Sequence, residues 1–574
     1  MHLGLLKFAQ KYFWFETPKP KGEFILEENK AGSCAVENSE SLDEFDKSRA
    51  IKDTDEYKGN QKLLDGRISK QLDYNIDTIK EIYSIPKNSD FLTREFNITV
   101  GDKSIRAFSV FIDGMTDRGV ISQNILQPLM VFSNFNFKDN ESNIENFIMR
   151  RLIAYNQVKA VDTFKSVVGE VNFGGCAVFV DGLEHAFVCD TKRWEHRGVG
   201  SPISETVIRG PQEAFNEQIR SNTALMRKIM KDKDLIIENV SIGKRSNTPC
   251  AVMYIKDIVN DALLSEVLRR AKSINVDYIF DSGELEQLLE DSTFMTIPQI
   301  ISTERPDRVA TLLAEGHVAV ALDGSPFVLV MPATVAEFLH TTEDTNMRYP
   351  FVNFIRAIRI IGIVIALLLP GLYIAVTNFH QEMIPTDLLF AIEASRETVP
   401  FPTVIEIILL EFSFELIREA SLRIPGAIGS TLGIVGGLIL GQAAVSANLV
   451  SPILIIVVAA TVLGSFALPS FSMSISIRLM RFLYIFLGAI AGFLGISLGL
   501  IINLLLLASA KSFGVPFLAP LGPVTKDRVA NVLTRRPVWQ QERRPDYLNP
   551  KDIKSQPHIS RGWKKKGNGD KNEE

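Results

Sequence analysis

The sequence contains little cysteine and almost no excess charge. The cysteines are four in 574 residues, and none belongs to a CxxC pair: Cys34, Cys176, Cys189 and Cys250. This spacing excludes the usual zinc and redox motifs and favours partly buried free thiols over a disulfide framework. The formal net charge of −5 is small for the length, so the composition indicates no nucleic-acid partner.

The short motifs of common enzyme sites are also missing. The chain has no HExxH, GxxxxGK[ST] or GxSxG, and its seven histidines are scattered. TERPDR (303–308) combines acids with arginine, but the apolar-periodic residues that follow, up to Gly316, are typical of a helix. Arg209 in VIRGPQEAF could bind an anion beside a helix N-terminus or could serve loop packing. We therefore expect no enzyme, no cofactor and no metal site.

Polarity divides the chain into segments. We predict a mostly disordered segment over 1–63, α/β subdomains over 64–205 and 206–345, a membrane domain over 350–523 and a basic cytoplasmic tail over 524–574. Residues 16–60 are rich in Lys, Glu, Asp and Ser, which favours disorder. The first fifteen residues contain Lys7 and Lys11 and precede no small-residue cleavage site, so we expect a cytosolic N-terminal region.

The two predicted subdomains resemble each other in sequence. SVFIDGMTD resembles AVMYIKDIVND, and aligning Asp113 with Asp257 gives an offset of 144 residues. Downstream, CAVFVDGLEHAFVCD resembles VAVALDGSPFVLVMP, with Asp181 and Asp323 offset by 142. The agreement predicts a tandem-duplicated α/β region.

Each copy is expected to contain a helix, two strands, a helix and a β-hairpin. The hairpins are predicted from Asp181-Gly182 and Asp323-Gly324, where glycine supplies the positive φ of a tight turn. Asn75 and Asn222 also correspond, at an offset of 147. A cleft between two such copies would be a plausible site for a ligand or partner.

Three uncharged runs predict an all-α polytopic membrane domain with about four spanning helices. The run 360–379 is long enough for one span, kinked at Pro370-Gly371. The run 424–477 suits two spans with a turn around Asn448 to Pro452, and 482–510 suits one tilted helix. Basic residues flank both ends of the domain, which predicts cytoplasmic termini and an even number of crossings. The amphipathic segment 384–423 could add re-entrant or interfacial helices.

Two stripes of glycine at helical spacing lie in these runs. The stripes are Gly429, Gly433, Gly437 and Gly441, followed by Gly488, Gly492, Gly495 and Gly499. Small residues on one face let helices approach closely, so the stripes are expected to pack on each other or across subunits. General enrichment of glycine in membrane helices is the alternative.

A stripe of acids precedes the second run. Glu406, Glu411, Glu415 and Glu419 share roughly one helical face of TVIEIILLEFSFELIREASLRIP. Carboxylates are costly in lipid and must face water, a partner or a pore. One interpretation is a cation pathway in which acids attract cations. The other is a surface helix that lies on the bilayer with its acids in water.

The sequence also contains six long motifs: VIRGPQEAFNEQIRSNTALMRK, TERPDRVATLLAEGHVAVALDGSPFVLVMP, LPGLYIAVTNFHQEMIPTDLL, EFSFELIREASLRIPGAIG, IVGGLILGQAAVSANLVSP and SFGVPFLAP. Together they resemble the A-subunit family of GerA-type spore germination receptors over roughly residues 70–545. The resemblance implies a multi-pass protein of the spore inner membrane. Its implied partners are a permease-like B subunit that binds nutrient, a lipoprotein C subunit and further copies of itself.

The resemblance also implies a cation channel that opens when the partner binds nutrient. We expect ion contact at Glu406, Glu411 and Glu415, with both termini cytoplasmic. A sister branch of the family acts beside dipicolinic acid release, and the RGPQEAF form is nearer the receptor branch. A non-conducting scaffold for the other subunits is the second hypothesis, and a membrane enzyme is the third. A monomeric size in detergent would argue against a pore.

Overall fold

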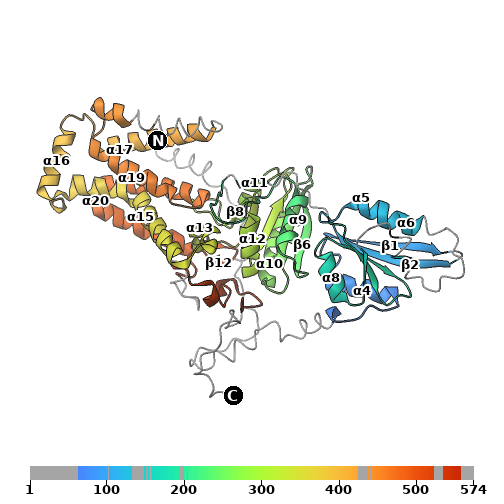
Figure 1. Ribbon diagram of the computed structural model, residues 1–574. Helices are drawn as coiled ribbons and strands as arrows, with labels where there is room; N and C mark the ends of the chain where they lie inside the picture. The colour runs from blue at the N-terminus through green and yellow to red at the C-terminus, as the bar shows by residue number, and fades with distance from the viewer. Residues whose placement is uncertain are drawn as a thin grey trace, which may run out of the picture.

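The computed structural model describes residues 63–100, 103–131, 148–149, 153, 158–192, 200–202, 204–423, 437, 441–522 and 534–556. The predicted N-terminal segment up to residue 62 lies outside these ranges, as do Cys34, Gly429 and Gly433. Figure 1 shows two α/β units and a bundle of long helices, arranged in the order of the chain. We call residues 63–192 unit 1, residues 204–346 unit 2, and residues 349–509 the bundle.

Unit 1 is a five-stranded sheet covered by helices on both faces. Its strands are β1 (Phe91–Val100), β2 (Lys103–Ile112), β3 (Val158–Val161), β4 (Cys176–Val180) and β5 (Ala186–Cys189), in the antiparallel order β1-β2-β4-β5-β3. Its helices are α4 (Leu72–Ile82), α5 (Arg118–Val120), η2 (Ile121–Leu126), α6 (Gln127–Met130) and α8 (Phe164–Val171). Apolar residues of α4 and α8 form one core with the sheet, and those of η2 and α6 form another.

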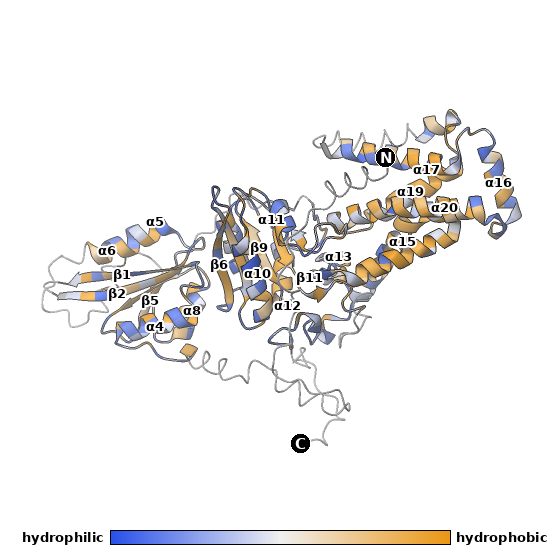
Figure 2. Ribbon diagram, turned by 180° about the vertical axis from the view of Figure 1, so that it is seen from behind, coloured by the Kyte–Doolittle hydropathy of each residue, from blue (hydrophilic) through white to orange (hydrophobic). Residues whose placement is uncertain are grey.

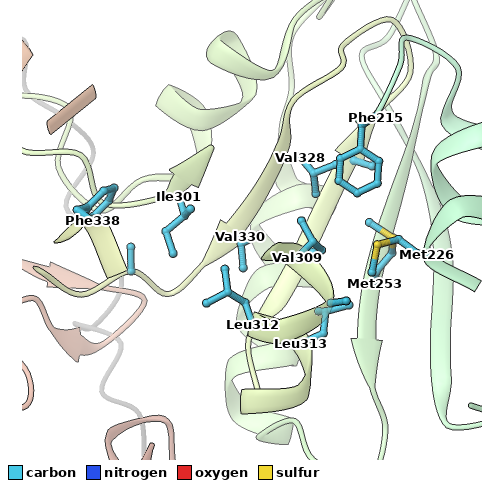
Figure 3. Close-up of a cluster of buried hydrophobic side chains, with 14 of the residues drawn as sticks. Phe215, Met226, Met253, Ile301, Val309, Leu312, Leu313, Val328, Val330 and Phe338 are labelled. Atoms are coloured by element: carbon cyan, nitrogen blue, oxygen red, sulfur yellow. The ribbon is translucent and has the colours of Figure 1, made fainter. Parts of the chain in front are cut away.

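Unit 2 repeats this strand order. Its strands are β6 (Leu235–Ile242), β7 (Thr248–Ile255), β8 (Ile301–Thr303), β9 (Val318–Leu322) and β10 (Val328–Met331), in the order β6-β7-β9-β10-β8. Its helices are α9 (Ile219–Ile229), α10 (Asp261–Ser273), α11 (Ser282–Leu289), α12 (Pro306–Glu315), α13 (Val335–Leu339) and α14 (Glu343–Asn346). Figure 3 shows the core beneath α9 and α12, where Met226 and Val309 face Met253 and Val328.

Equivalent residues make equivalent hydrogen bonds in the two units. Asn75 Oδ1 accepts from Ser69 N at 2.9 Å, and Asn222 Oδ1 accepts from Asn216 N at the same distance. In addition, Asn75 Nδ2 donates to Ser69 O and Asn222 Nδ2 donates to Asn216 O, both at 2.6 Å. The side chain therefore closes the turn that leads into α4 or α9, which gives the sequence correspondence a structural cause.

The two Asp-Gly turns are also equivalent. Gly182 and Gly324 have φ of 86° and 93°, as the predicted hairpins require. Asp181 Oδ1 accepts from Leu72 N at 3.2 Å, and Asp323 Oδ1 accepts from Ile219 N at 3.0 Å. Leu72 and Ile219 begin α4 and α9, so each hairpin supplies a carboxylate to the N-terminus of the first helix of its unit.

The seam between the units is closed by buried polar groups. Arg227 of α9 is 2% exposed, and its Nη2 donates to Asn88 Oδ1 at 2.9 Å. Its Nε lies 3.5 Å from Asp90 Oδ2. Ser89 N donates to the β6 carbonyl of Ile237 at 3.1 Å. Burial raises the pKa of Asp90 to about 6, although Arg227 opposes the shift.

The bundle contains the apolar helices. Its helices are α15 (Tyr349–Phe379), η5 (Gln381–Met383), α16 (Thr386–Arg396), α17 (Thr403–Arg423), α19 (Pro452–Phe466) and α20 (Phe471–Ser509). Among the described residues, α15 and α20 are long and apolar enough to cross a membrane, and α19 is a shorter apolar helix. This is two candidates where four were predicted, because α19 has only 15 residues and only Gly437 is described within 424–440. In Figure 2, α15, α19 and α20 are coloured mostly as hydrophobic.

Helix α20 folds back on itself, which corrects the prediction of one tilted helix. Gly492 leaves helical geometry, with φ 58° and ψ −135°. Asn503 Nδ2 then donates to Tyr484 Oη at 3.2 Å, whereas nineteen residues of continuous helix would separate the two by about 28 Å. The two arms, 471–491 and 493–509, are therefore antiparallel. Because a left-handed φ is open mainly to glycine, Gly492 makes this hairpin possible.

Both ends of the α20 hairpin lie against unit 2. Ser476 in the first arm of α20 donates to Thr296 O of unit 2. Beyond the second arm, Ser512 Oγ donates to Gln299 O at 2.6 Å. The short strands β11 (Lys511–Ser512) and β12 (Val515–Pro516) follow. The predicted turn is present, since Asn448 has φ 54° and α19 begins at Pro452.

The end of the described chain packs against unit 2. It contains η6 (Val538–Gln540) and η7 (Asp546–Leu548). Lys551 N donates to Ile258 O at 2.8 Å, and Arg544 Nε donates to Ala314 O at 2.7 Å. Tyr547 Oη donates to Glu337 Oε1 at 2.9 Å. Residues 534–556 of the predicted tail are thus an ordered part of unit 2's surface.

Candidate functional site in the helical bundle

Helix α17 carries the four predicted acids along the bundle. Its first residue, Thr403, lies at the end of α15 farthest from unit 2, with Oγ1 3.3 Å from Asn378 Oδ1. Toward its other end, Arg418 lies over the ring of Phe466 at 4.8 Å. Glu406 and Glu411 are both 0% exposed, Glu415 is partly buried, and Glu419 is exposed. The acids therefore pass from the interior of the bundle to its edge.

The outward face of α17 is apolar. Its exposed large side chains are Ile405, Ile408, Leu409, Phe412 and Leu416. This is the reverse of a helix that lies on a bilayer with its acids in water, because the first two acids point into the bundle.

Glu411 and Glu415 are ion-paired with the first arm of α20. Glu411 Oε2 lies 3.1 Å from Arg481 Nη1, and both side chains are at most 1% exposed. Glu415 Oε1 lies 3.3 Å from Arg481 Nη2, and its Oε2 accepts from Arg478. Neither Glu411 oxygen makes a hydrogen bond of good geometry within the described residues. Glu411 is therefore held by charge, through its pair with Arg481.

The carboxylate of Glu406 is bound mainly by a backbone N–H group. Its Oε2 accepts from Ser451 N at 2.9 Å, just before α19 begins. The nearest arginine atom, Arg396 Nε, is 3.9 Å from Oε1. Oε1 has no hydrogen-bond partner in the part of the chain that the structure describes. Of the three buried or half-buried acids, Glu406 is the least neutralised.

The charges of α17 and α20 nearly cancel in one chain. Glu411 and Glu415 face Arg478 and Arg481, with Arg418 close by. Removing one partner of such a buried pair is costly, because the remaining charge loses its compensation. The two arginines were not predicted as site residues. The available signal was that arginines 478 and 481 interrupt an apolar helix, where a charge needs a partner.

The described glycines of the predicted stripes pack elsewhere than on each other. A Cβ on Gly488 would lie 2.8 Å from the carbonyl oxygen of Gly371 in α15. A Cβ on Gly499 would meet Leu487 and Tyr484 of the opposite α20 arm. Gly492 makes the α20 turn, Gly495 lies against the carbonyl of Leu487, Gly437 has Phe414 3.7 Å away, and Gly441 has no close neighbour among the described residues.

The motifs TERPDR and VIRGPQEAF bind each other. Arg305 is 1% exposed, and its Nη2 donates to Pro211 O at 3.0 Å and to Asp307 Oδ2 at 2.8 Å. Glu304 Oε1 accepts from Glu205 N at 3.0 Å. As predicted, α12 begins at Pro306 and ends beside Gly316, whose φ is 109°. These charged side chains hold the loop that precedes α9 against the start of α12.

Two α/β units of one topology, joined to a bundle with two helices long and apolar enough to cross a membrane, define a membrane protein with a duplicated α/β region. The chain belongs to the family described as Bacillus/Clostridium GerA spore germination protein, whose model matches residues 77–547. The resemblance found in the sequence is thereby confirmed.

Relatives in this family are similar over most of their length. Spore germination protein KA of Bacillus subtilis (strain 168) is 39% identical over 515 residues, or 88% of this chain and 93% of that protein. Spore germination protein GerLA of Bacillus cereus is 33% identical, over 84% of this chain and 97% of its own. The crystal structure of the N-terminal domain of the A subunit of the Bacillus megaterium spore germinant receptor GerK3 is 32% identical, with a TM-score of 0.37, over 47% of this chain and 97% of its own.

Proposed function

We propose that this chain is the A subunit of a nutrient-responsive germination receptor, and that it conducts cations as an oligomer. The observation that carries the proposal is the complete burial of Glu406 and Glu411 between helices of an apolar bundle. Buried acids in such a bundle are costly and are typical of ion pathways. The family and the names of its relatives support the receptor role.

The proposed gate is an exchange of ion pairs. In the described conformation Arg481 is shared by Glu411 and Glu415. A shift of α17 along α20 would release a carboxylate toward a passing cation, while Glu406 stays available. Nutrient binding to a permease-like B subunit would bias the two arrangements. The soluble units and a lipoprotein C subunit would transmit or stabilise that bias.

The proposed location is the spore inner membrane, with both termini cytoplasmic. The α20 hairpin contributes two traversals of the bundle instead of one, and α17 contributes another. With α15, α19 and the span predicted within 424–446, the proposed count is six crossings rather than four. An even count agrees with the start of α15 and the end of the α20 hairpin both lying beside unit 2.

The test is flux of monovalent cations into liposomes that contain the purified full chain, with and without its partner subunits. Glu406→Gln keeps the side-chain size and removes the charge, so we expect flux to fall at least about tenfold, the factor that 1.4 kcal/mol of lost cation stabilisation would give. Glu393→Gln, at an exposed position of α16 outside the acid stripe, is the matched control and should conduct normally. Normal flux through Glu406→Gln would remove this carboxylate from the mechanism.

A non-conducting scaffold is the second candidate. The pairing of Glu411 and Glu415 with arginines favours it, because paired acids attract cations weakly. The mass of the detergent-solubilised complex separates the two, since a strict monomer leaves no place for a shared pore. A sister-branch role in dipicolinic acid and ion release predicts flux without dependence on a nutrient-binding partner. We propose no enzymatic activity.

A further inference from the structure

A cavity of about 550 Å³ lies where unit 2, the start of α15 and the ordered end of the chain meet. Its walls come from α12 to α14, from the first turns of α15 and from residues 534–547. Five arginines line it: Arg308, Arg356, Arg535, Arg536 and Arg543. Four acids share the lining: Glu315, Glu337, Asp344 and Glu542. Three parts of the protein that are distant in sequence therefore share one arginine-rich wall.

The arginines around Asp344 outnumber the carboxylates that pair with them. Asp344 Oδ2 lies 3.1 Å from Arg356 Nε and 3.0 Å from Arg359 Nη1, so one acid serves two cations. Arg535 is 8% exposed, and among the described residues its guanidinium group donates to the carbonyls of Met347 and Thr345, at 3.1 and 3.2 Å. Within the described ranges no carboxylate lies within salt-bridge distance of Arg535. Asp344 thus serves two guanidinium groups, and the guanidinium group of Arg535 beside them has no carboxylate of its own among the described residues.

The other buried acid of the lining does not offset this excess. Glu337 accepts from Tyr547 Oη at 2.9 Å, and one of its oxygens lies 3.4 Å from His317 Nε2. Arg308 is neutralised by Glu205, which lies outside the cavity. The hydroxyl of Thr342, also in the lining, is buried and has no hydrogen-bond partner among the described residues. The wall near Asp344 thus combines uncompensated guanidinium charge with an unsatisfied hydroxyl.

We propose that this cavity binds a phosphate group, either of a soluble phosphate compound or of an anionic lipid headgroup. Guanidinium forks match the oxygens of a phosphate, and such charge-assisted hydrogen bonds are strong. The position suits both sources, because Arg356 precedes the uncharged run that begins at Ile360, and the cavity also opens among the polar residues of the tail. The bound phosphate would fasten the ordered tail to unit 2 and α15, independently of ion conduction.

The test measures thermal unfolding of the full chain in uncharged detergent. Pyrophosphate is titrated against sodium chloride at equal ionic strength, and nanodiscs of phosphatidylglycerol are compared with nanodiscs of phosphatidylcholine. A ligand that binds the folded state raises the Tm by mass action. We expect a saturable rise with one of the two phosphate sources, and Arg535→Gln should weaken the apparent affinity about tenfold.

Arg536→Gln covers the case in which Arg535→Gln does not fold, because Arg536 is half-buried and lines the same wall. Arg245→Gln, on a remote turn of unit 2 where Arg245 is 84% exposed, is the control and should respond like the wild type. A response to pyrophosphate assigns a soluble ligand, and a response only to phosphatidylglycerol assigns a lipid. No response to either, or an equal response in all variants, overturns the proposal.

Discussion

Asp257 shows how two copies of one fold have diverged at a single residue. Its sequence counterpart in unit 1, Asp113, is paired with Arg118 at 2.5 Å and with Arg220 at 3.5 Å. Asp257 has a buried Oδ1 without a hydrogen-bond partner among the described residues. Burial, with Asp234 nearby, raises the pKa of Asp257 to about 6.

The raised pKa makes the contribution of Asp257 to stability depend on pH. An acid whose pKa is higher in the folded than in the unfolded protein stabilises the fold when protonated and loses that effect as pH rises through 6. Asp257→Asn should therefore raise the free energy of unfolding by about 1–2 kcal/mol at pH 8 and leave it unchanged at pH 4. Thermal unfolding across this range measures the difference. Asp277→Asn, at an exposed pair with Arg245, should show no such slope, and an equal slope would contradict the assignment.

Glu411 and Arg481 form the most buried charge pair among the described residues of the bundle. Single and double substitutions should show how strongly each charge depends on the other for stability. Arg481→Met leaves Glu411 buried without compensation, so we expect a loss of about 3–5 kcal/mol. Glu411→Gln combined with Arg481→Met removes both charges and should recover most of that loss. Unfolding in detergent measures the coupling between the two changes. Additive effects would show that the 3.1 Å pair does not hold α17 to α20.

Helices approach closely at a crossing between α15 and α20, as they do where Gly362 of α15 meets Gly464 of α19. A Cβ on Gly488 would lie 2.8 Å from Gly371 O, which real Cβ atoms do not tolerate. Gly488→Ala should thus destabilise the bundle by about 1–3 kcal/mol, because a helix must move away. Gly169→Ala, in helix α8 with open space around it, should be neutral or slightly stabilising. Equal melting temperatures for the two variants would argue against a tight crossing.

The elements that could be predicted are those specified by local sequence. The Asp-Gly hairpins, the α12 start at Pro306 and the turn at Asn448 each depend on a few neighbouring residues. The edge strands β3 and β8 were not predicted, because four and three residues carry little periodic signal. The α20 hairpin was not predicted either, since Gly492 is one glycine among several at the same spacing.

The candidate site was only half predictable for a related reason. The acids of α17 follow a helical spacing within one segment, so their shared face can be read from the sequence. Their partners on α20 are 63 and 66 residues away from Glu415. Which charges meet is set by tertiary packing, and a single sequence without structure does not specify that pairing.

The ordered end of the chain ties the soluble units to the bundle. Residues 534–556 bind unit 2 through Lys551, Arg544 and Tyr547, while Arg535 N donates to Asn353 Oδ1 of α15 at 2.6 Å. A segment held at both places should stay bound after the chain is cut. We therefore predict that a protease site inserted within 524–533 can be cleaved without release of the fragment that follows.

Co-elution of the two pieces in size-exclusion chromatography measures this association. Lys551→Ala together with Arg544→Ala removes the ion pair with Asp261 and the hydrogen bond to Ala314, so the cut fragment should dissociate more readily. Lys554→Ala is the matched control, because no side-chain bond from Lys554 to unit 2 is present among the described contacts. If the cut wild-type fragment separates on dilution, the tail is only covalently attached, and movements of unit 2 would reach the bundle through the start of α15 and through the contacts of Ser476 and Ser512 with unit 2.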